Sequence, residues 1–165
     1  MKPKDLSIVI VTFKSESKIF NCLNSIPSDH DVIVVENSNN LNFKSDIEKK
    51  YVNVKCFLTG TNKGYAIANN IGLKNVKTKY ALVLNPDTIV EKNAIENFLI
   101  TADKFKDFWL IGPANDQSVN YEFQEKKVKE VDNLKGFAIF FNLSKFNSNF
   151  FDENFFLYFE EIDLC

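Results

Sequence analysis

The chain has 165 residues, which suffices for one domain built around one hydrophobic core. Apolar residues make up 45% of the sequence and charged residues 25%, a balance that excludes a disordered chain. The formal net charge of −2 excludes a general basic field for holding nucleic acid, so any phosphate must be bound locally.

The first two thirds of the sequence alternate between apolar runs and amphipathic stretches. The runs are rich in β-branched residues, which is typical of strands buried on both faces of a parallel sheet. Ser15 is expected to cap the first helix and Pro27 to end it. In chain order, the predicted elements are strand 6–11, helix 15–26, strand 31–35, helix 43–51, strand 52–58, helix 62–76, strand 80–84 and helix 92–102.

This alternation predicts an α/β fold with a mostly parallel central sheet and helices on both of its faces. Ligands in such sheets bind outside the carboxyl ends of the strands, so chemistry is expected in the loops that follow the strands. The loops with suitable side chains are Thr12-Phe13, Glu36-Asn37 and Asn85-Pro86-Asp87.

The last third of the sequence differs in character. Short strands are predicted at 108–111 and 136–141, and the polar stretch between them, 115–129, indicates a hairpin or a mobile loop. The stretch 146–165 is dense in aromatic residues and ends in acids. Two interpretations of its aromatic part stay open: core packing beneath the acids, or an exposed platform for a ligand.

The numbers and positions of cysteine and histidine limit which disulfides and ligand sites the chain can form. The three cysteines are far apart and odd in number, which argues against a disulfide framework and fits free thiols in a cytoplasmic compartment. His30 is the one histidine, so a site rich in histidine ligands is excluded within this chain. No apolar run of about 18 residues is present, so we expect no membrane-spanning helix, while peripheral membrane contact stays open.

Two of the loops carry candidate ligands. Asp87 follows a proline-stiffened turn, where a carboxylate is suited to hold Mg²⁺ or Mn²⁺ beside a diphosphate. The alternative for Asp87 is a cap on the following helix. Glu36 and Asn37 are suited to bind the base or ribose of a nucleotide, and the alternative is ordinary turn formation.

Two further groups are candidates for phosphate binding and for proton transfer. Asn62 and Lys63 open a helix, whose amide groups and lysine attract phosphate; the alternative is an ordinary helix start with a solvated lysine. Glu160, Glu161 and Asp163 follow a very apolar stretch, and a carboxylate in such surroundings suits a general base. The alternative for these acids is a charged helix face.

Together and in this order, the motifs resemble the inverting family 2 glycosyltransferases of the GT-A fold, particularly their rhamnosyltransferase-like branch. The resemblance spans nearly the whole chain. It implies one GT-A domain over 1–165, with a nucleotide-binding half at about 1–105 and the start of an acceptor half at about 106–165. The matching segments are SIVIVTFKS at 7–15, DVIVVENS at 31–38, TNKGYAIANNIGLK at 61–74, YALVLNPDT at 80–88, GFAIFFN at 136–142 and FDENFFLYFEEIDLC at 151–165.

The resemblance also implies roles for individual residues. Asn85-Pro86-Asp87 matches the Asp-x-Asp (DXD) metal motif of the family, with Asp87 as the ligand to Mg²⁺ or Mn²⁺. Glu161 matches the catalytic base, and Glu160 and Asp163 are the neighbouring acids that compete for this role. The residues expected to border the nucleotide are Thr12, Phe13, Glu36, Asn37, Asn62, Lys63, Asn85 and Asp87.

The sequence departs from the family pattern in three ways. Asn85 replaces the first Asp of the metal motif, as is common in this branch, and a neutral residue there predicts weaker metal affinity. Glu36 and Glu161 stand where Asp is usual, so each carboxylate is one methylene farther from the backbone. Family members usually continue beyond the position of Cys165 with an Arg and further helices, so the chain is expected to be truncated at its C-terminus.

The resemblance implies sugar transfer, with inversion, from a nucleoside-diphosphate sugar to a saccharide or lipid-linked acceptor. The expected donors are dTDP-rhamnose or a UDP-hexose, and the expected setting is cell-surface polysaccharide synthesis at the inner face of the cytoplasmic membrane. Two alternatives stay open: a catalytically incomplete nucleotide-sugar-binding fragment, and a sugar nucleotidyltransferase. The latter needs a Gly- and Arg-rich loop after the first strand, where this chain has Thr12-Phe13-Lys14-Ser15.

Overall fold

A six-stranded sheet in the order β3-β2-β1-β4-β6-β5 is present among the residues that the computed structural model describes, which are 5–113, 128–147, 150–157 and 163–165. Its strands are β1 (Leu6–Thr12), β2 (Asp31–Glu36), β3 (Val54–Leu58), β4 (Tyr80–Leu84), β5 (Leu110–Ile111) and β6 (Ala138–Asn142). The helices are α1 (Glu16–Ser25), α2 (Leu41–Lys50), α3 (Gly64–Lys74) and α4 (Ala94–Lys104), and a 3₁₀ turn, η2, covers Leu143–Lys145. Within the described ranges, no helix is long and apolar enough to cross a membrane.

The mostly parallel sheet expected from the sequence is confirmed. Strands β1, β2, β3 and β4 pair in parallel, whereas β6 runs antiparallel to β4 and β5 runs antiparallel to β6. The third strand begins two residues later than predicted, because the Val54 amide closes a turn onto the Tyr51 carbonyl at 3.1 Å and leaves Val52 97% exposed. Most of the polar stretch 115–129 lies outside the described residues.

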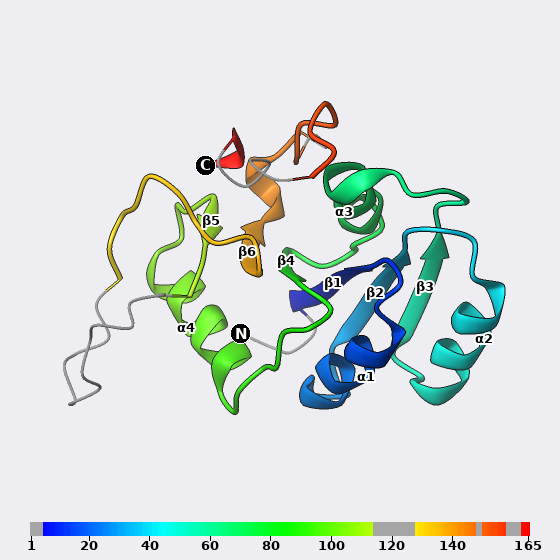
Figure 1. Cartoon of the computed structure of the whole chain (residues 1–165). Helices are drawn as coiled ribbons and strands as arrows, with labels where there is room; N and C mark the ends of the chain where they lie inside the picture. Colours follow the sequence, from blue (N-terminus) through cyan, green and yellow to red (C-terminus); the bar gives the residue numbers. More distant parts are fainter. Residues whose placement is uncertain (1–4, 114–127, 148–149, 158–162) are drawn as a thin grey trace.

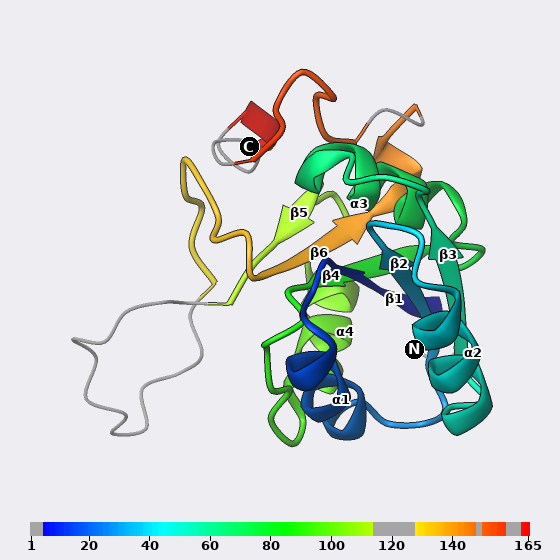
Figure 2. The ribbon, with the colours of Figure 1, turned by 45° about the vertical axis from the view of Figure 1, so that its right-hand side comes forward.

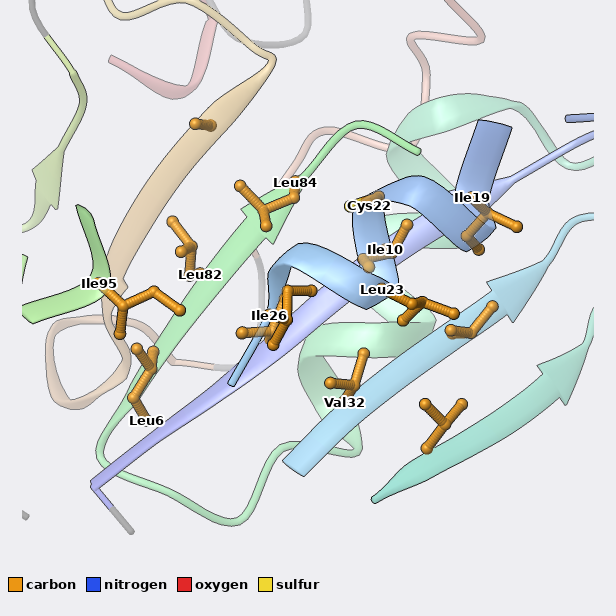
Figure 3. Close-up of a cluster of buried hydrophobic side chains, with 14 of the residues drawn as sticks. Leu6, Ile10, Ile19, Cys22, Leu23, Ile26, Val32, Leu82, Leu84 and Ile95 are labelled. Atoms are coloured by element: carbon orange, nitrogen blue, oxygen red, sulfur yellow. The ribbon is translucent and has the colours of Figure 1, made fainter. Parts of the chain in front are cut away.

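The helices cover the two faces of the sheet unequally. Helices α1, α2 and α4 lie on one face and α3 lies on the other, as both views of the ribbon show (Figure 1 and Figure 2). Successive residues of β1 serve the two faces in turn, because side chains alternate along a strand. Ile8 and Ile10 pack with α1, whereas Val9 packs with α3. Figure 3 shows the cluster of buried apolar side chains on the face that α1, α2 and α4 cover. Side chains of α1 such as Ile19 and Leu23 lie over the sheet there.

Helix α3 lies close against the sheet at Gly72. A Cβ atom added there would lie 2.3 Å from Val9 Cγ1 and 3.3 Å from Val35 Cγ2. Gly72→Ala is therefore expected to lower the free energy of unfolding by about 1–3 kcal/mol, the usual cost of overpacking a core. Urea unfolding measures the change. Adding Val9→Ala frees the space, so the double variant should be more stable than the sum of the single effects; strict additivity would contradict the steric explanation.

Two buried thiols make the fold sensitive to alkaline pH. Burial raises the pKa of Cys22 to about 12 and that of Cys56 to about 11, from an ordinary value of 9.0. Above pH 9.0 the unfolded chain therefore releases thiol protons that the folded protein retains, and the free energy of unfolding should fall as the pH rises further. Urea unfolding from neutral pH to about pH 10 tests this. The Cys22→Ala/Cys56→Ala double variant should show a shallower decline, and an unchanged slope would contradict the assignment to these thiols.

Side chains of α2 occupy the outer side of β3, which is the first strand of the sheet order. Glu48 Oε1 accepts a hydrogen bond from the Cys56 amide at 2.7 Å, and Lys44 Nζ donates to the Cys56 carbonyl. Lys44 and Glu48 also form an ion pair at 3.1 Å, one helical turn apart. Burial opposes ionisation of Glu48, but the bonds from Cys56 and Lys44 outweigh it and lower the pKa of this carboxyl.

Candidate functional site

The polar residues that follow β1, β2 and β4 lie at one edge of the sheet. Thr12 and Glu36 are paired residues at the ends of their parallel strands, and the amide of Asn37 donates to the Thr12 carbonyl at 2.8 Å. Strand β4 flanks β1 on the other side and ends at Leu84, opposite Ile10. Because the chain leaves β1 toward β2 on one side and reaches β4 on the other, this edge is a switch point where α/β proteins bind ligands.

The Glu36 carboxylate organises the loop after β2. Its Oε1 accepts from Ser38 Oγ at 2.6 Å and its Oε2 accepts from the Asn40 amide at 3.0 Å. The Asn40 side chain in turn caps α2 by accepting from the Phe43 amide at 3.0 Å. Glu36 is 2% exposed, and its buried carboxyl group accepts from two donors. These bonds are the turn chemistry expected for this loop, and a contact between Glu36 and a nucleotide stays a prediction.

The side-chain amide of Asn37 is fully occupied by protein groups. Its Nδ2 donates to Asn62 Oδ1 at 3.0 Å and to the Gly64 carbonyl at 3.1 Å. Its Oδ1 accepts from the Lys63 amide at 2.9 Å and from Thr59 Oγ1 at 3.1 Å. The loop that leads into α3 is thus folded around Asn37. The structure brings Asn37, Asn62 and Lys63 together as the sequence predicts, and their contact with phosphate stays a prediction.

The loop after β1 offers one polar atom with no partner. Thr12 Oγ1 is buried and has no hydrogen-bond partner among the described residues. Phe13 is 38% exposed beside it, and Lys14 stands in the left-handed region with φ 52°. Ser15 Oγ donates to the Phe13 carbonyl at 3.0 Å and makes no capping bond to α1, so the predicted cap is wrong. An unbonded hydroxyl next to a half-exposed ring is compatible with a ligand at this edge.

The turn after β4 holds Asp87 in an exposed position. The Asn85 amide donates to the Phe137 carbonyl at 3.0 Å, which ties this turn to the loop before β6. Helix α4 begins only at Ala94, with Asn93 in the N-cap position, so Asp87 does not cap a helix. The capping alternative considered for Asp87 is therefore wrong.

Lys18 is a neighbour of the candidate residue Asp87 that the sequence analysis missed. Its Nζ lies 3.4 Å from Asp87 Oδ2, and the side chains are 62% and 52% exposed. The signal for it was its position in the first turn of α1, because the helix that follows β1 must start at the carboxyl edge of the sheet. Lys18 therefore brings a second, positive charge to the turn that carries Asp87.

Asp87 is the described residue at this edge that could contribute a ligand to a divalent cation. Asp87 offers an exposed carboxylate, an oxygen ligand of the kind that Mg²⁺ and Mn²⁺ prefer. Within the described part of the chain, no group of three or more His, Cys, Asp or Glu side chains is arranged to hold a metal by itself. The remaining ligands would therefore come from phosphate oxygens and water.

The acid-bearing segment is described only in part. Glu160 and Glu161 lie outside the described residues, and Asp163 is exposed. Just before them, the Phe156 carbonyl accepts from the Tyr65 amide at 2.8 Å, which places residue 156 at the start of α3. Because α3 follows β3, its start lies at the carboxyl edge of the sheet.

Core packing holds for the first part of the aromatic stretch, and the role of the later part as a platform for a ligand stays a prediction. Phe146, Phe150 and Phe151 pack around Phe141, with ring centroids 5.6, 6.2 and 5.8 Å away, so the first part is core. Phe156 and Leu157 are 58% and 52% exposed, so the later part presents apolar surface.

Comparisons with known proteins agree with this geometry. The chain is 28% identical to the low-salt glycan biosynthesis hexosyltransferase Agl10 of Haloferax volcanii, over 98% of this chain and 60% of that protein. It is also 28% identical to an uncharacterized glycosyltransferase of Haemophilus influenzae, over 58% of this chain and 42% of that protein. The chain thus spans less than two thirds of the length of either relative.

Solved glycosyltransferase structures share the fold. Residues 1–349 of TarS from S. aureus superpose with a TM-score of 0.67 at 22% identity, over 90% of this chain and 50% of that chain. The mannosyltransferase PcManGT from Pyrobaculum calidifontis, solved with GDP-Man and Mn²⁺, superposes with a TM-score of 0.64 at 13% identity, over 91% of this chain and 48% of that one. The expected GT-A fold is confirmed. The sequence profile of the family described as Glycosyl transferase family 2 matches residues 7–164, so the chain belongs to glycosyl transferase family 2.

Proposed function

We propose that this domain transfers a sugar from a nucleoside-diphosphate donor to a saccharide or lipid-linked acceptor, with inversion at the anomeric carbon. The observation that carries the proposal is the meeting of three loops at one sheet edge: Thr12 and Glu36 end β1 and β2, and Asp87 lies in the turn after β4. Family membership supports the reaction class. In this proposal residues 1–105 form the nucleotide-binding half, and 106–165 begin the acceptor half.

The proposed reaction is a single displacement. Glu161 takes the proton of an acceptor hydroxyl, whose oxygen forms a bond to the anomeric carbon. On the opposite face the bond from that carbon to the diphosphate oxygen breaks, and the electron pair leaves with the nucleoside diphosphate. Fixing the acceptor and donor in line supplies much of the rate, because it replaces a bimolecular encounter.

The leaving diphosphate gathers negative charge, which the edge near Asp87 is suited to balance. Asp87 would hold Mg²⁺ or Mn²⁺, and the bound ion supplies a Lewis acid that neutralises the leaving group. Lys18, 3.4 Å from Asp87, adds a positive charge on the protein itself. Asn85 in place of a second acid would make the affinity of this site for the ion weaker.

The donor and the setting are further parts of the proposal. The rhamnosyltransferase resemblance favours dTDP-rhamnose, while solved neighbours were crystallised with UDP-GlcNAc, UDP and GDP-Man. These complexes support a nucleotide-sugar partner of some kind. We place the reaction in surface polysaccharide assembly at the inner face of the cytoplasmic membrane.

A donor panel tests the proposed function. Calorimetry with UDP, dTDP and GDP, each with and without Mn²⁺, is followed by incubation with the matching nucleotide sugars, an acceptor panel and detection of the released nucleoside diphosphate. Metal-dependent binding of one nucleotide together with transfer or donor hydrolysis is the expected result. Binding without either reaction would indicate a binding module instead. Pyrophosphate release from a nucleoside triphosphate and a sugar phosphate would indicate a nucleotidyltransferase.

A further inference from the structure

Asn70, a buried residue of α3, holds the chain just before the acids. Its Nδ2 donates to the Phe151 carbonyl at 2.9 Å, and its Oδ1 accepts from the Phe151 amide at 3.0 Å. One side chain thus satisfies both backbone groups of Phe151, as a paired strand would. Asn70 is 2% exposed, so removing its amide would leave buried polar groups of Phe151 unbonded. The same Asn70 Nδ2 also donates a hydrogen bond to Glu153 Oε1 at 3.0 Å.

A second anchor holds the same segment at the start of α3. The Tyr65 amide, in the first turn where helical amides lack partners within the helix, donates to the Phe156 carbonyl at 2.8 Å. Gly64 makes this approach possible. Its φ is +82°, and a Cβ atom there would lie 2.4 Å from the Phe156 carbonyl oxygen. Only glycine allows the two backbones to meet so closely.

The two anchors set the direction of the segment. Residue 151 lies against Asn70 and residue 156 against Gly64, so the segment runs back along α3 toward its start, as the orange and red part of the chain does in Figure 1 and Figure 2. The acids follow within a few residues. Beyond them, Leu164 packs against the core cluster that includes α3.

The turn that receives Phe156 is the turn that binds Asn37. The Gly64 carbonyl accepts from Asn37 Nδ2 at 3.1 Å, and the Lys63 amide donates to Asn37 Oδ1 at 2.9 Å. A single turn therefore touches the loop after β2 on one side and the acid-bearing segment on the other. The saturated amide of Asn37 favours a positioning role for this residue.

We propose that Asn70 is a positioning residue for sugar transfer: it clamps residues 150–157 onto α3 and so holds Phe156 beside the turn that binds Asn37. This inference rests on the proposed function. Gly64 assists by receiving Phe156, and Asn37 links that turn to the β2 loop. None of the three needs to touch the reacting atoms.

The test combines amide exchange with kinetics on the whole chain. Asn70→Ala is compared with Asn75→Ala, a control at the C-cap of the same helix, where Asn75 Nδ2 donates to the Ile71 carbonyl of α3 at 2.9 Å. In hydrogen exchange without ligand, Asn70→Ala should speed exchange at Phe151 and Tyr65 by at least about tenfold, while amides inside α3 keep their protection. Gly64→Ala, acting on the second anchor, should speed exchange at Tyr65.

Enzyme kinetics distinguish a positioning role of Asn70 from a general loss of folded structure. Asn70→Ala should lower kcat by at least about tenfold with the donor KM nearly unchanged, whereas Asn75→Ala should change neither. Exchange at Phe151 as fast in the wild type as in Asn70→Ala would overturn the proposal, and so would an equal loss of kcat and donor affinity. If the exchange results hold but the wild type transfers no sugar from any donor, the proposed function fails while the clamp itself stands.

Discussion

Replacing Glu161 with glutamine is expected to lower the turnover of sugar transfer by about 10²–10⁴-fold and to leave donor affinity nearly unchanged. Glutamine keeps the size of the side chain but cannot accept the proton of the acceptor hydroxyl. The loss should therefore appear in the chemical step, because base catalysis acts in the transition state. Initial rates with the donor found by the panel measure kcat, and calorimetry with the corresponding nucleoside diphosphate measures binding.

Matched variants at the neighbouring acids show whether the base is correctly assigned. Glu160→Gln and Asp163→Asn change the charge of the same short stretch by the same amount. Each of these variants should lower the turnover of sugar transfer much less than Glu161→Gln does. Normal turnover in Glu161→Gln, with a large loss in one of the other two, would move the role of base to that residue.

Asp87→Asn is expected to remove the metal dependence of donor binding and to lower transfer by at least about tenfold. Asparagine keeps the shape of the side chain but loses the charge that holds a divalent cation beside the diphosphate. In the wild type, Mn²⁺ should tighten nucleotide binding, and in the variant the affinity with Mn²⁺ should equal that without it. Calorimetric titrations of the nucleoside diphosphate at matched ionic strength give both values.

Lys18→Met is the control for the ion pair that Asp87→Asn also breaks. The two side chains are 3.4 Å apart and more than half exposed, and such pairs contribute little to stability. Lys18→Met should therefore keep the response to Mn²⁺. If it abolished that response as fully as Asp87→Asn does, the metal assignment to Asp87 would be contradicted.

Much of the sheet could be predicted because a strand buried on both faces has a continuous run of apolar residues in the sequence. The continuous apolar runs at 6–11 and 80–84 became β1 and β4 with little change in their bounds. The direction of β6 could not be predicted in this way. An apolar strand pairs in either direction, and the antiparallel register between Tyr80 and Asn142 depends on how the chain returns to the sheet.

In the candidate site too, some features could be predicted from the sequence, whereas others depend on contacts between distant parts of the chain. That Glu36 and Asp87 lie at one edge follows from the predicted parallel direction of the strands, whose carboxyl ends share an edge of the sheet. The hydrogen bonds of the Asn37 side chain with residues 59–64 could not be predicted in this way, because these partners come from a loop in another part of the sequence. The missing cap at Ser15 reflects a local choice, in which Lys14 adopts a left-handed backbone and the Ser15 hydroxyl turns back to Phe13.

The bonds from Lys44 and Glu48 to Cys56 have a consequence for how copies of the protein meet. A border strand with free amides and carbonyls invites an extended segment of a second molecule to add to the sheet. At the middle of β3 those groups are already taken by α2, and at the opposite border β5 has only two residues. Addition of a strand from a second molecule is therefore disfavoured at the middle of β3, and the described part of the opposite border offers only a short strand for pairing.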